Sequence, residues 1–402
     1  MAKFSHEPII EAACQNGGLP GVVLTAGDAT GKFQYAKAFG QNARGETLAL
    51  DSVMWIASNT KIVTAVAALQ QVEKGKIGLD DDITKVIPEI ASLQVLAGFE
   101  EGGKPIYEDR KFPLTLRILL THTSGFTHPL FNAKLQQLEK YTGPLVADSR
   151  TILGDCTLPL VCQPGESWEY GLSYDVAGKL IERLSGLSLE DYMRANVWDP
   201  LDMPLISFVP DSKPEMKARM IKSSTRAGPG KLVPGDMYFH QLGGDKDDAY
   251  GGAGLWASAD TYAKLLHSLC ANDGRVLGKE MADELFRPQL RPDVREALNE
   301  TARTVEAVRQ IYANSFDMDH QIIDQALGGM VGTRDEPDRK RAGTMAWGGF
   351  PNLIWWVDRK AGLWGSVFTN LVPAGDVEAT ELAAVFERSI YEQYEEFKKQ
   401  NA

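Results

Sequence analysis

The chain has 402 residues, more than one simple core usually holds, so its length favours two domains or one domain with a large insertion. The formal net charge of -12 argues against nucleic-acid binding, which needs clustered basic side chains to displace counterions. The four cysteines are too few and too scattered for a disulfide framework or a common zinc motif, and we expect reduced thiols and no metal.

The composition, 44% hydrophobic and 24% charged, is that of a water-soluble globular protein. No run of about 18 apolar residues offers a membrane span. The first residues also lack the continuous apolar stretch of a secretory signal. We therefore expect a cytoplasmic protein with no membrane partner.

Taken in chain order, both ends of the sequence predict strands flanked by helices. Residues 6–16 read as a helix, and residues 22–41 as two strands around a Gly-Asp-Ala-Thr-Gly turn. Residues 353–370 are again two apolar strands around a turn, followed by a helix over about 377–399. The stretches 224–236 and 333–343, rich in Gly, Pro and charge, read as exposed loops.

The middle of the chain has helical periodicity and Pro/Gly loops instead. The predicted fold class is therefore α+β: a central antiparallel sheet flanked by helices, with a mainly helical inserted domain. We predict one domain from residues 1–83 and 241–402, an inserted domain over 84–240, and an active site between them.

The stretch "SNTKIVTAVAAL" places a serine and a lysine three residues apart at the head of an apolar helix. Ser58 and Lys61 therefore share one face, and a lysine on a buried helix is either paired or has its pKa lowered by desolvation, as a general base requires. Lys61 is thus placed to deprotonate Ser58, and the helix N-terminus offers N–H groups for an oxyanion. The structural alternative is that Ser58 caps the helix while Lys61 reaches out to solvent.

Other nucleophile schemes have less support. The chain contains no G-x-S-x-G elbow, no H-E-x-x-H, no phosphate-binding loop and no dinucleotide-binding glycine motif. A Ser-His-Asp arrangement with His122 or His128 as base stays open. Yet no motif selects a partner for either histidine, and "LLTHTSGF" also reads as a helix end running into a turn.

A Ser-Lys pair still needs a proton shuttle and a second oxyanion donor. Tyr170 lies in "PGESWEYG", just ahead of a helix, and a tyrosine near an ammonium group can exchange protons because its phenolate is favoured. Gly348-Gly349 precedes a strand, where the small residues let backbone N–H groups approach a carbonyl. Each of these signals is weak when taken separately.

Together with "LRILLTHTSGF" and "YGGAGLWASADTYAKLLHSL", these segments resemble the serine β-lactamase/penicillin-binding-protein superfamily. The likeness covers nearly the whole chain and is strongest to the branch of class C β-lactamases, family VIII carboxylesterases and fungal transesterases. It implies that Ser58 is the acylated nucleophile, Lys61 the base and Tyr170 the shuttle. The oxyanion hole would comprise the backbone N–H groups of Ser58 and Phe350, with Gly349 in place of Phe350 if the register slips by one residue.

The chain departs from the family pattern in two places. Where β-lactamases carry Tyr-x-Asn, this sequence has Tyr170-Gly171-Leu172, with Asp175 following. Where they carry a cation before the glycine motif, it has Trp347, and an indole favours a neutral, bulky group over a carboxylate. Efficient β-lactamase or D-peptidase activity is therefore not expected. The predicted substrate-binding residues are Trp347, Gly348, Asp175, Phe126 and Trp256, with Tyr238 and Phe239 as further aromatic candidates.

The resemblance implies an acyltransferase that takes an acyl group from a thioester or ester donor and passes it to a hydroxyl of a small natural product in secondary metabolism, such as a polyketide. The alternative is a carboxylesterase that uses water as acceptor, and a non-catalytic binding protein is a third reading. No cofactor is implied, since the chain supplies nucleophile, base and oxyanion donors.

An acyl carrier protein is a candidate partner, because residues 211–231 contain six basic and two acidic side chains. A solvated loop face is the alternative explanation for the same charges.

Overall fold

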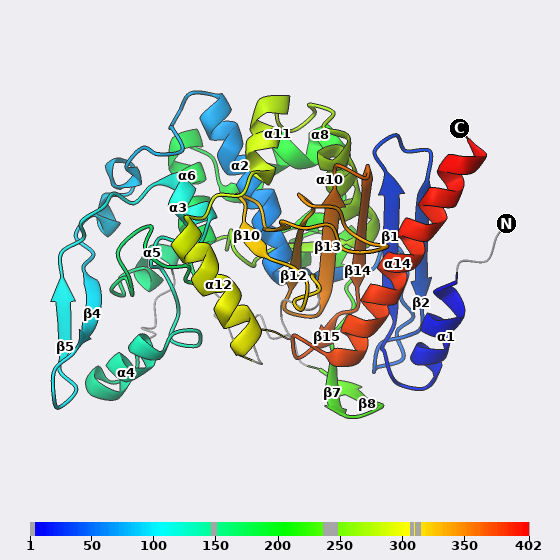
Figure 1. The fold of residues 1–402 in the computed structure, drawn as a ribbon, viewed down its shortest axis with the longest axis horizontal. Helices are drawn as coiled ribbons and strands as arrows, with labels where there is room; N and C mark the ends of the chain where they lie inside the picture. The colour runs from blue at the N-terminus through cyan, green and yellow to red at the C-terminus, as the bar shows by residue number, and fades with distance from the viewer. Residues whose placement is uncertain (1–4, 146–150, 236–247, 306–308, 310–314, 402) are drawn as a thin grey trace.

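The computed structural model describes residues 5–145, 151–235, 248–305, 309 and 315–401 (Figure 1). Its centre is a seven-stranded antiparallel sheet in the order β10-β11-β12-β13-β14-β1-β2. The strands are β1 (Val22–Asp28), β2 (Gln34–Phe39), β10 (Ile323–Gln325), β11 (Met330–Gly332), β12 (Met345–Gly349), β13 (Leu353–Asp358) and β14 (Leu363–Phe368). The N-terminal hairpin thus joins strands from the far end of the chain, with β1 paired to β14.

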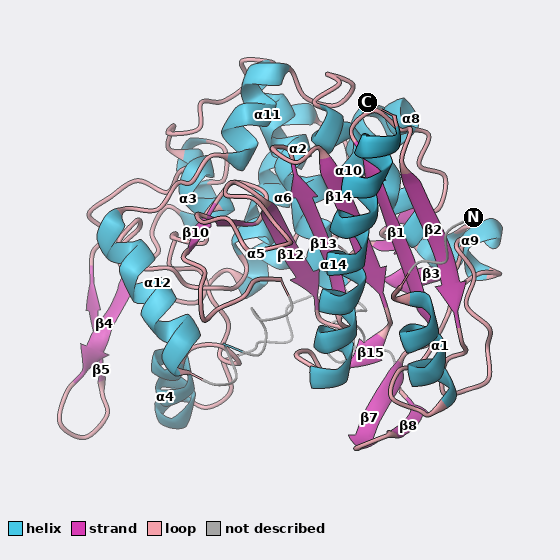
Figure 2. Cartoon of the chain, turned by 45° about the vertical axis from the view of Figure 1, so that its right-hand side comes forward, coloured by secondary structure: helices cyan, strands magenta, loops and turns pink. Residues whose placement is uncertain are grey.

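Helices cover both faces of this sheet (Figures 1 and 2). Helix α10 (Ala259–Ala271) lies on one face, and α1 (Glu7–Gln15) and α14 (Val377–Gln400) lie on the other. Since side chains on either face are covered, all residues of β1, β13 and β14 are buried. This explains why β13 and β14 read as apolar strands rather than as alternating patterns.

Helix α2 (Thr60–Glu73) is buried along nearly its whole length and packs against α6 (Ser173–Ser185). Beyond α10, the chain adds α11 (Lys279–Phe286) and α12 (Pro292–Thr304). A small sheet contains β3 (Val53–Trp55), β9 (Trp256–Ser258) and β6 (Ile206–Ser207), in that order. Strand β3 ends a few residues before α2 begins.

The region between α2 and β9 is rich in short helices. They are η2 (Ile83–Lys85), η3 (Pro88–Ile90), α3 (Leu116–Leu120), α4 (Ala133–Thr142), α5 (Ile152–Asp155), α7 (Leu189–Met193), η4 (Arg194–Trp198), α8 (Asp199–Leu201), η5 (Pro210–Ser212) and α9 (Pro214–Lys217). Two hairpins accompany them, β4 (Val95–Phe99) with β5 (Pro105–Glu108), and β7 (Ser224–Gly228) with β8 (Lys231–Pro234).

The predicted α+β class is confirmed: an antiparallel sheet flanked by helices, with strands from both chain ends. The expected terminal hairpins and helices form within one or two residues of their predicted limits. The domain boundaries at 83/84 and 240/241 stay a prediction. Within the described ranges, no helix combines the length and apolar composition needed to cross a lipid bilayer.

Two loop predictions were wrong. Residues 224–236 contain the hairpin β7–β8, whose strand β7 also pairs with β15 (Leu371–Val372). Residues 333–343 are not an exposed loop throughout, because Glu336, Arg339 and Lys340 are buried. Arg339 and Lys340 both form ion pairs with Glu387 of α14, a partner that lies far away in the sequence.

Candidate active site

Ser58 lies in a single 3-10 turn, η1 (Ala57–Asn59), which runs directly into α2. The preceding Ala57 has a φ of 44°, a left-handed conformation that a residue with a Cβ adopts at an energetic cost. Ser58 does not cap the helix: the N-cap residue of η1 is Ile56 and that of α2 is Asn59. Its hydroxyl instead contacts side chains, so the capping explanation for this serine fails.

Two of the predicted partners meet at the Ser58 hydroxyl. Lys61 Nζ donates to Ser58 Oγ at 3.1 Å, and the Tyr170 hydroxyl lies 2.6 Å from the same oxygen. Ser58 and Tyr170 are partly exposed, whereas Lys61 is only 4% exposed. The arrangement gives one hydroxyl a nitrogen partner and a phenol partner, which are the groups that proton transfer to and from an oxygen requires.

Lys61 does not reach out to solvent. Its Nζ also donates to the carbonyl oxygen of Gly252 at 2.7 Å and lies 4.8 Å from the centre of the Tyr170 ring. The ammonium group, the hydroxyl and the ring thus form one contiguous group. A lysine held in this way needs no solvent contact to remain satisfied.

Contacts with other segments fix both the backbone and the ring of Tyr170. The Thr127 hydroxyl donates to the Tyr170 carbonyl at 2.7 Å, and a Cβ on Gly171 would lie 2.3 Å from Thr127 Cα, so the two segments touch at backbone level. The phenol ring packs 4.8 Å from the His122 ring and 5.9 Å from the Trp347 ring. These contacts fix the direction in which the hydroxyl points.

His122 is buried in this ring cluster and forms no hydrogen bond with Ser58 in the described structure. Neither of its ring nitrogens has a hydrogen-bond partner among the described residues. Burial, followed by the charge of Lys61, lowers the pKa of His122 well below its usual value, so the ring is neutral. The His128 imidazole accepts the Leu130 backbone N–H at 3.1 Å. These contacts give the Ser-His-Asp alternative no support.

The glycine motif ends strand β12 beside the turn that carries Ser58. A Cβ on Gly349 would lie 2.5 Å from the carbonyl oxygen of Ile56, a distance that real Cβ atoms do not adopt, so this position requires glycine. The next residue, Phe350, packs 6.4 Å ring to ring from Trp55, just ahead of η1. The backbone of 349–350 therefore runs alongside the backbone that carries Ser58.

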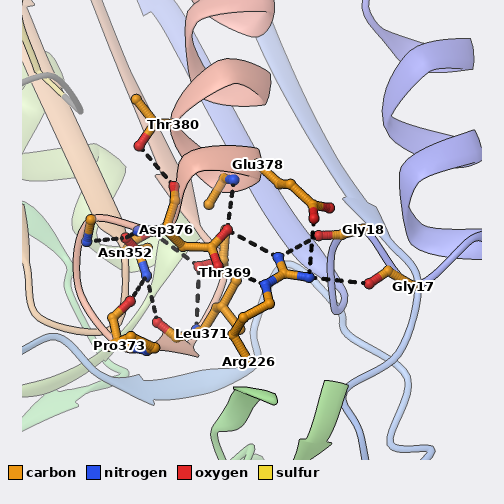
Figure 3. A network of polar contacts seen from close by, with 12 residues as sticks. Gly17, Gly18, Arg226, Asn352, Thr369, Leu371, Pro373, Asp376, Glu378 and Thr380 are labelled. Atoms are coloured by element: carbon orange, nitrogen blue, oxygen red, sulfur yellow. Dashed lines mark hydrogen bonds and ion pairs between the residues drawn. The ribbon is translucent and has the colours of Figure 1, made fainter. Parts of the chain in front are cut away.

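A polar network anchors the turn that follows (Figure 3). Asn352 has a φ of 53°, and its side-chain amide donates to the carbonyls of Leu371 and Pro373 while its oxygen accepts from the N–H groups of Gly375 and Asp376. Asp376 in turn caps α14 and pairs with Arg226 at 2.7 Å. The turn after Gly349 is thus tied to the start of the last helix and to the β7–β8 hairpin.

The predicted substrate-binding residues are dispersed. The Trp347 ring lies beside Tyr170 and stacks on His122, and Gly348 follows it on β12, paired with Ile354. Phe126 is buried, and its carbonyl lies close to Gly171. Trp256 is buried in a separate cluster with Trp55 and Ala57, the residue before Ser58. Tyr238 and Phe239 lie outside the described residues.

Asp175 lies in the protein interior, on α6. It is 5% exposed and accepts the Gly252 backbone N–H at 2.9 Å. Burial raises the pKa of Asp175 to about 6, and the nearby charge of Lys61 acts in the opposite direction.

Two further features were not predicted from the sequence. Leu130 and Phe131 are 62% and 56% exposed, unusual for large apolar residues, and the Phe131 ring lies 5.5 Å from that of Tyr170. Gly252 supplies the carbonyl that receives Lys61. In the sequence, the first feature appears as "HPLF", an apolar pair in a polar loop, and the second as "YGGAG", a run of glycines. Neither stretch indicates which distant residue it contacts.

Known proteins resemble the chain over almost its full length. The family model described as beta-lactamase matches residues 7–388. The monacolin J acid methylbutanoyltransferase of Aspergillus terreus is 32% identical, covering 97% of this chain and 96% of the relative. The lovastatin esterase of Penicillium rubens is also 32% identical, with 97% and 98% covered.

Among solved structures, unliganded simvastatin synthase from Aspergillus terreus superposes with a TM-score of 0.91 at 31% identity, covering 98% of this chain and 99% of the other. Sequence and fold agree over the whole length, and the chain therefore belongs to the beta-lactamase family.

Proposed function

We propose that this protein is a serine acyltransferase that forms an acyl-enzyme on Ser58 from a thioester or ester donor and passes the acyl group to a hydroxyl of a small natural product. The observation that carries the proposal is the meeting of Lys61 Nζ and the Tyr170 hydroxyl at Ser58 Oγ. Two of the relatives are named for acyl transfer in statin chemistry, and another is named as an esterase acting on lovastatin.

In the first half-reaction, Ser58 Oγ attacks the acyl carbon of the donor while its proton passes to the Lys61 amine. The backbone N–H groups of Ser58 and Phe350 would receive the oxyanion, with Gly349 as the alternative donor. The tetrahedral intermediate collapses, and the departing thiolate or alkoxide takes the proton of the Tyr170 hydroxyl. The products are the Ser58 ester, a lysine ammonium and a tyrosine phenolate.

The second half-reaction restores each group. The acceptor hydroxyl gives its proton to the Tyr170 phenolate and attacks the Ser58 ester. Ser58 Oγ then leaves as it recovers a proton from the Lys61 ammonium. No proton is gained or lost over the cycle, so the three side chains suffice without a metal or an organic cofactor.

Water can replace the alcohol in the second half-reaction, and hydrolysis is the alternative function. The surroundings of the Tyr170 hydroxyl favour an apolar acceptor: Trp347 and the exposed Phe131 pack against its ring. A bulky apolar alcohol would cover these surfaces and exclude water from the ester, which is the condition for transfer. Trp347 in place of a cation also offers no charge to a β-lactam or peptide carboxylate.

A carrier-bound donor receives less support than the charges of 211–231 suggest. Four of the six basic side chains are engaged within the chain: Lys213 with Glu190, Lys217 with Asp211, Arg219 with Asp51, and Arg226 with Asp376. Lys222 and Lys231 are exposed. If the segment docks an acidic carrier protein, charge reversal at Lys217 and Arg219 will slow transfer from a carrier-bound donor and leave a free thioester unaffected.

The test is to mix the purified protein with a short-chain acyl thioester, with and without a panel of polyketide alcohols, and to follow intact mass and product together. We expect a mass gain that requires Ser58 and decays rapidly when an alcohol is present. Rapid decay in water alone would identify an esterase. If neither the thioester nor an activated ester labels Ser58, and Ser58→Ala behaves like the wild type, the proposal is wrong.

A further inference from the structure

The segment Gly251-Gly252 contacts both α2, which carries Lys61, and α6, which begins three residues after Tyr170. On the α2 side, the carbonyl of Gly251 accepts from the Thr64 hydroxyl at 2.6 Å and that of Gly252 accepts from Lys61 Nζ at 2.7 Å. Lys61 and Thr64 are one helical turn apart, so consecutive carbonyls of the segment meet one face of α2.

On the α6 side, the same segment is pressed against backbone and a carboxyl group. A Cβ on Gly251 would lie 2.5 Å from the Tyr174 carbonyl oxygen, and a Cβ on Gly252 would lie 2.9 Å from Asp175 Oδ2. Asp175 Oδ1 accepts the Gly252 N–H at 2.9 Å. The approach to backbone requires glycine at position 251, and at position 252 a larger residue would displace the Asp175 carboxylate, so the segment is packed closely between α6 and Lys61.

We propose that Asp175 is a positioning residue for Lys61: it holds Gly252 so that the carbonyl of Gly252 anchors the Lys61 amine, and its carboxylate balances the charge of the ammonium group that forms when this amine takes the Ser58 proton. The inference rests on the proposed function and assigns Asp175 a role behind the lysine, in place of the substrate contact expected from the sequence.

The position of Asp175 in the motif segment supports this role. Tyr170-Gly171-Leu172 has no polar side chain at its third position, and Ser173 is engaged with Ser124 at 2.8 Å. Asp175 is then the acidic side chain of this segment whose pKa the nearby charge of Lys61 lowers, against the larger effect of burial. A buried carboxylate is retained at a cost in stability, so it needs a function that outweighs the cost.

Other titratable groups lie near the Asp175 carboxyl, and a pH experiment needs a control for them. Lys61 faces it from α2, Asp155 from α5, and Tyr250 from the loop before Gly251. The Tyr250 hydroxyl donates to Asp155 at 3.2 Å, so Asp155 is a second carboxyl of the same region. The variant Asp155→Asn therefore separates the titration of Asp175 from that of its neighbour.

The experiment measures the rate of Ser58 acylation by a short-chain acyl thioester in single turnover, from pH 4.5 to 8, as a function of donor concentration. Asp175→Asn is the central variant, because its amide oxygen can still accept from Gly252 while the charge is removed. Asp175→Ala removes both. Asp358→Asn, at the opposite end of β13 from the glycine motif, is the matched buried control; Asp358 accepts the N–H groups of Arg341 and Ala361.

We expect the maximal acylation rate to fall by roughly tenfold to a hundredfold in Asp175→Asn and further in Asp175→Ala, with the apparent affinity for the donor little changed, since misplacement of a catalytic group acts on the rate. The wild-type rate should decline as the pH falls through about 6, where the Asp175 carboxylate takes up a proton. This decline should be absent in Asp175→Asn and retained in Asp155→Asn and Asp358→Asn.

A wild-type rate and pH profile in both Asp175 variants would overturn the inference alone, as would a loss confined to donor affinity. Absence of any Ser58 adduct on the wild-type protein would instead overturn the proposed function, and this inference with it. Circular dichroism on each variant distinguishes loss of rate from loss of fold, and the isosteric Asp175→Asn change preserves the packing against Gly252.

Discussion

Tyr170→Phe is the sharpest test of the proposed chemistry, because it removes one oxygen and leaves the ring in place. The hydroxyl lies 2.6 Å from Ser58 Oγ, whereas the ring carries the contacts with His122, Trp347 and Lys61. A positioned acid-base group contributes about 10² to 10⁴ in rate, equivalent to roughly 3 to 5.5 kcal/mol of activation free energy. We expect both half-reactions to slow by that factor.

The stability of this variant should hardly change, because Tyr170 is partly exposed and its hydroxyl is not enclosed in the core. The assay is single-turnover acylation followed by addition of an alcohol, with the acyl-enzyme and the product both quantified by mass. Thermal unfolding of the variant provides the control for fold. Rates within about threefold of the wild type in both half-reactions would refute the shuttle role and leave Lys61 as the sole proton carrier.

Three further changes have defined outcomes. Gly349→Ala forces a Cβ against the Ile56 carbonyl, so the end of β12 must shift and acylation should fall by about 10² to 10³ in maximal rate, measured in the same assay. Glu387→Gln leaves the buried Lys340 without its ion-pair partner and Arg339 with Glu336 at 3.5 Å, and should lower the free energy of unfolding by about 3 to 5 kcal/mol in urea titrations. The raised pKa of Asp175 means that the folded protein holds its proton more tightly than the unfolded chain, so wild-type stability is lost as pH rises from about 4 to 6. Asp175→Asn should escape this loss and gain up to about 3 kcal/mol relative to the wild type between pH 4 and 7.

The elements that the sequence predicted well are those whose signal is local. The strands of residues 22–41 and 353–370 and the final helix are marked by apolar runs and turn residues within a few positions of each other. Ser58 and Lys61 are likewise three residues apart, so helical geometry alone brings them together. Tyr170 is 112 residues from Ser58, and only the order of the family motifs indicated that the two would meet.

The two wrong loop predictions have one physical cause: charged residues in these segments pair with residues that lie far away in the sequence. Residues 333–343 read as an exposed loop because they are charged, yet Arg339 and Lys340 are buried by pairing with Glu387 on another element. Arg226 similarly lies in a hairpin that reads as a loop, and its partner Asp376 comes from the start of α14 (Figure 3). The composition of a segment shows its charge, but it does not show which oppositely charged side chain the fold places beside it.

Backbone contacts between distant segments place the Ser58 turn and Lys61. On one side, Gly252 carries a carbonyl to Lys61, and on the other, Gly349 brings the end of β12 against the Ile56 carbonyl. A Cβ at Gly349 would meet the Ile56 backbone and a Cβ at Gly252 would meet the Asp175 carboxylate, so each close approach uses a glycine that has no chemistry of its own. The S-x-x-K spacing places Ser58 and Lys61 on one helix face. Gly252 and Gly349 let two other backbone segments approach that face. A chain with Ser58 and Lys61 intact but a larger residue at either glycine should therefore keep its fold and lose its acyl-enzyme.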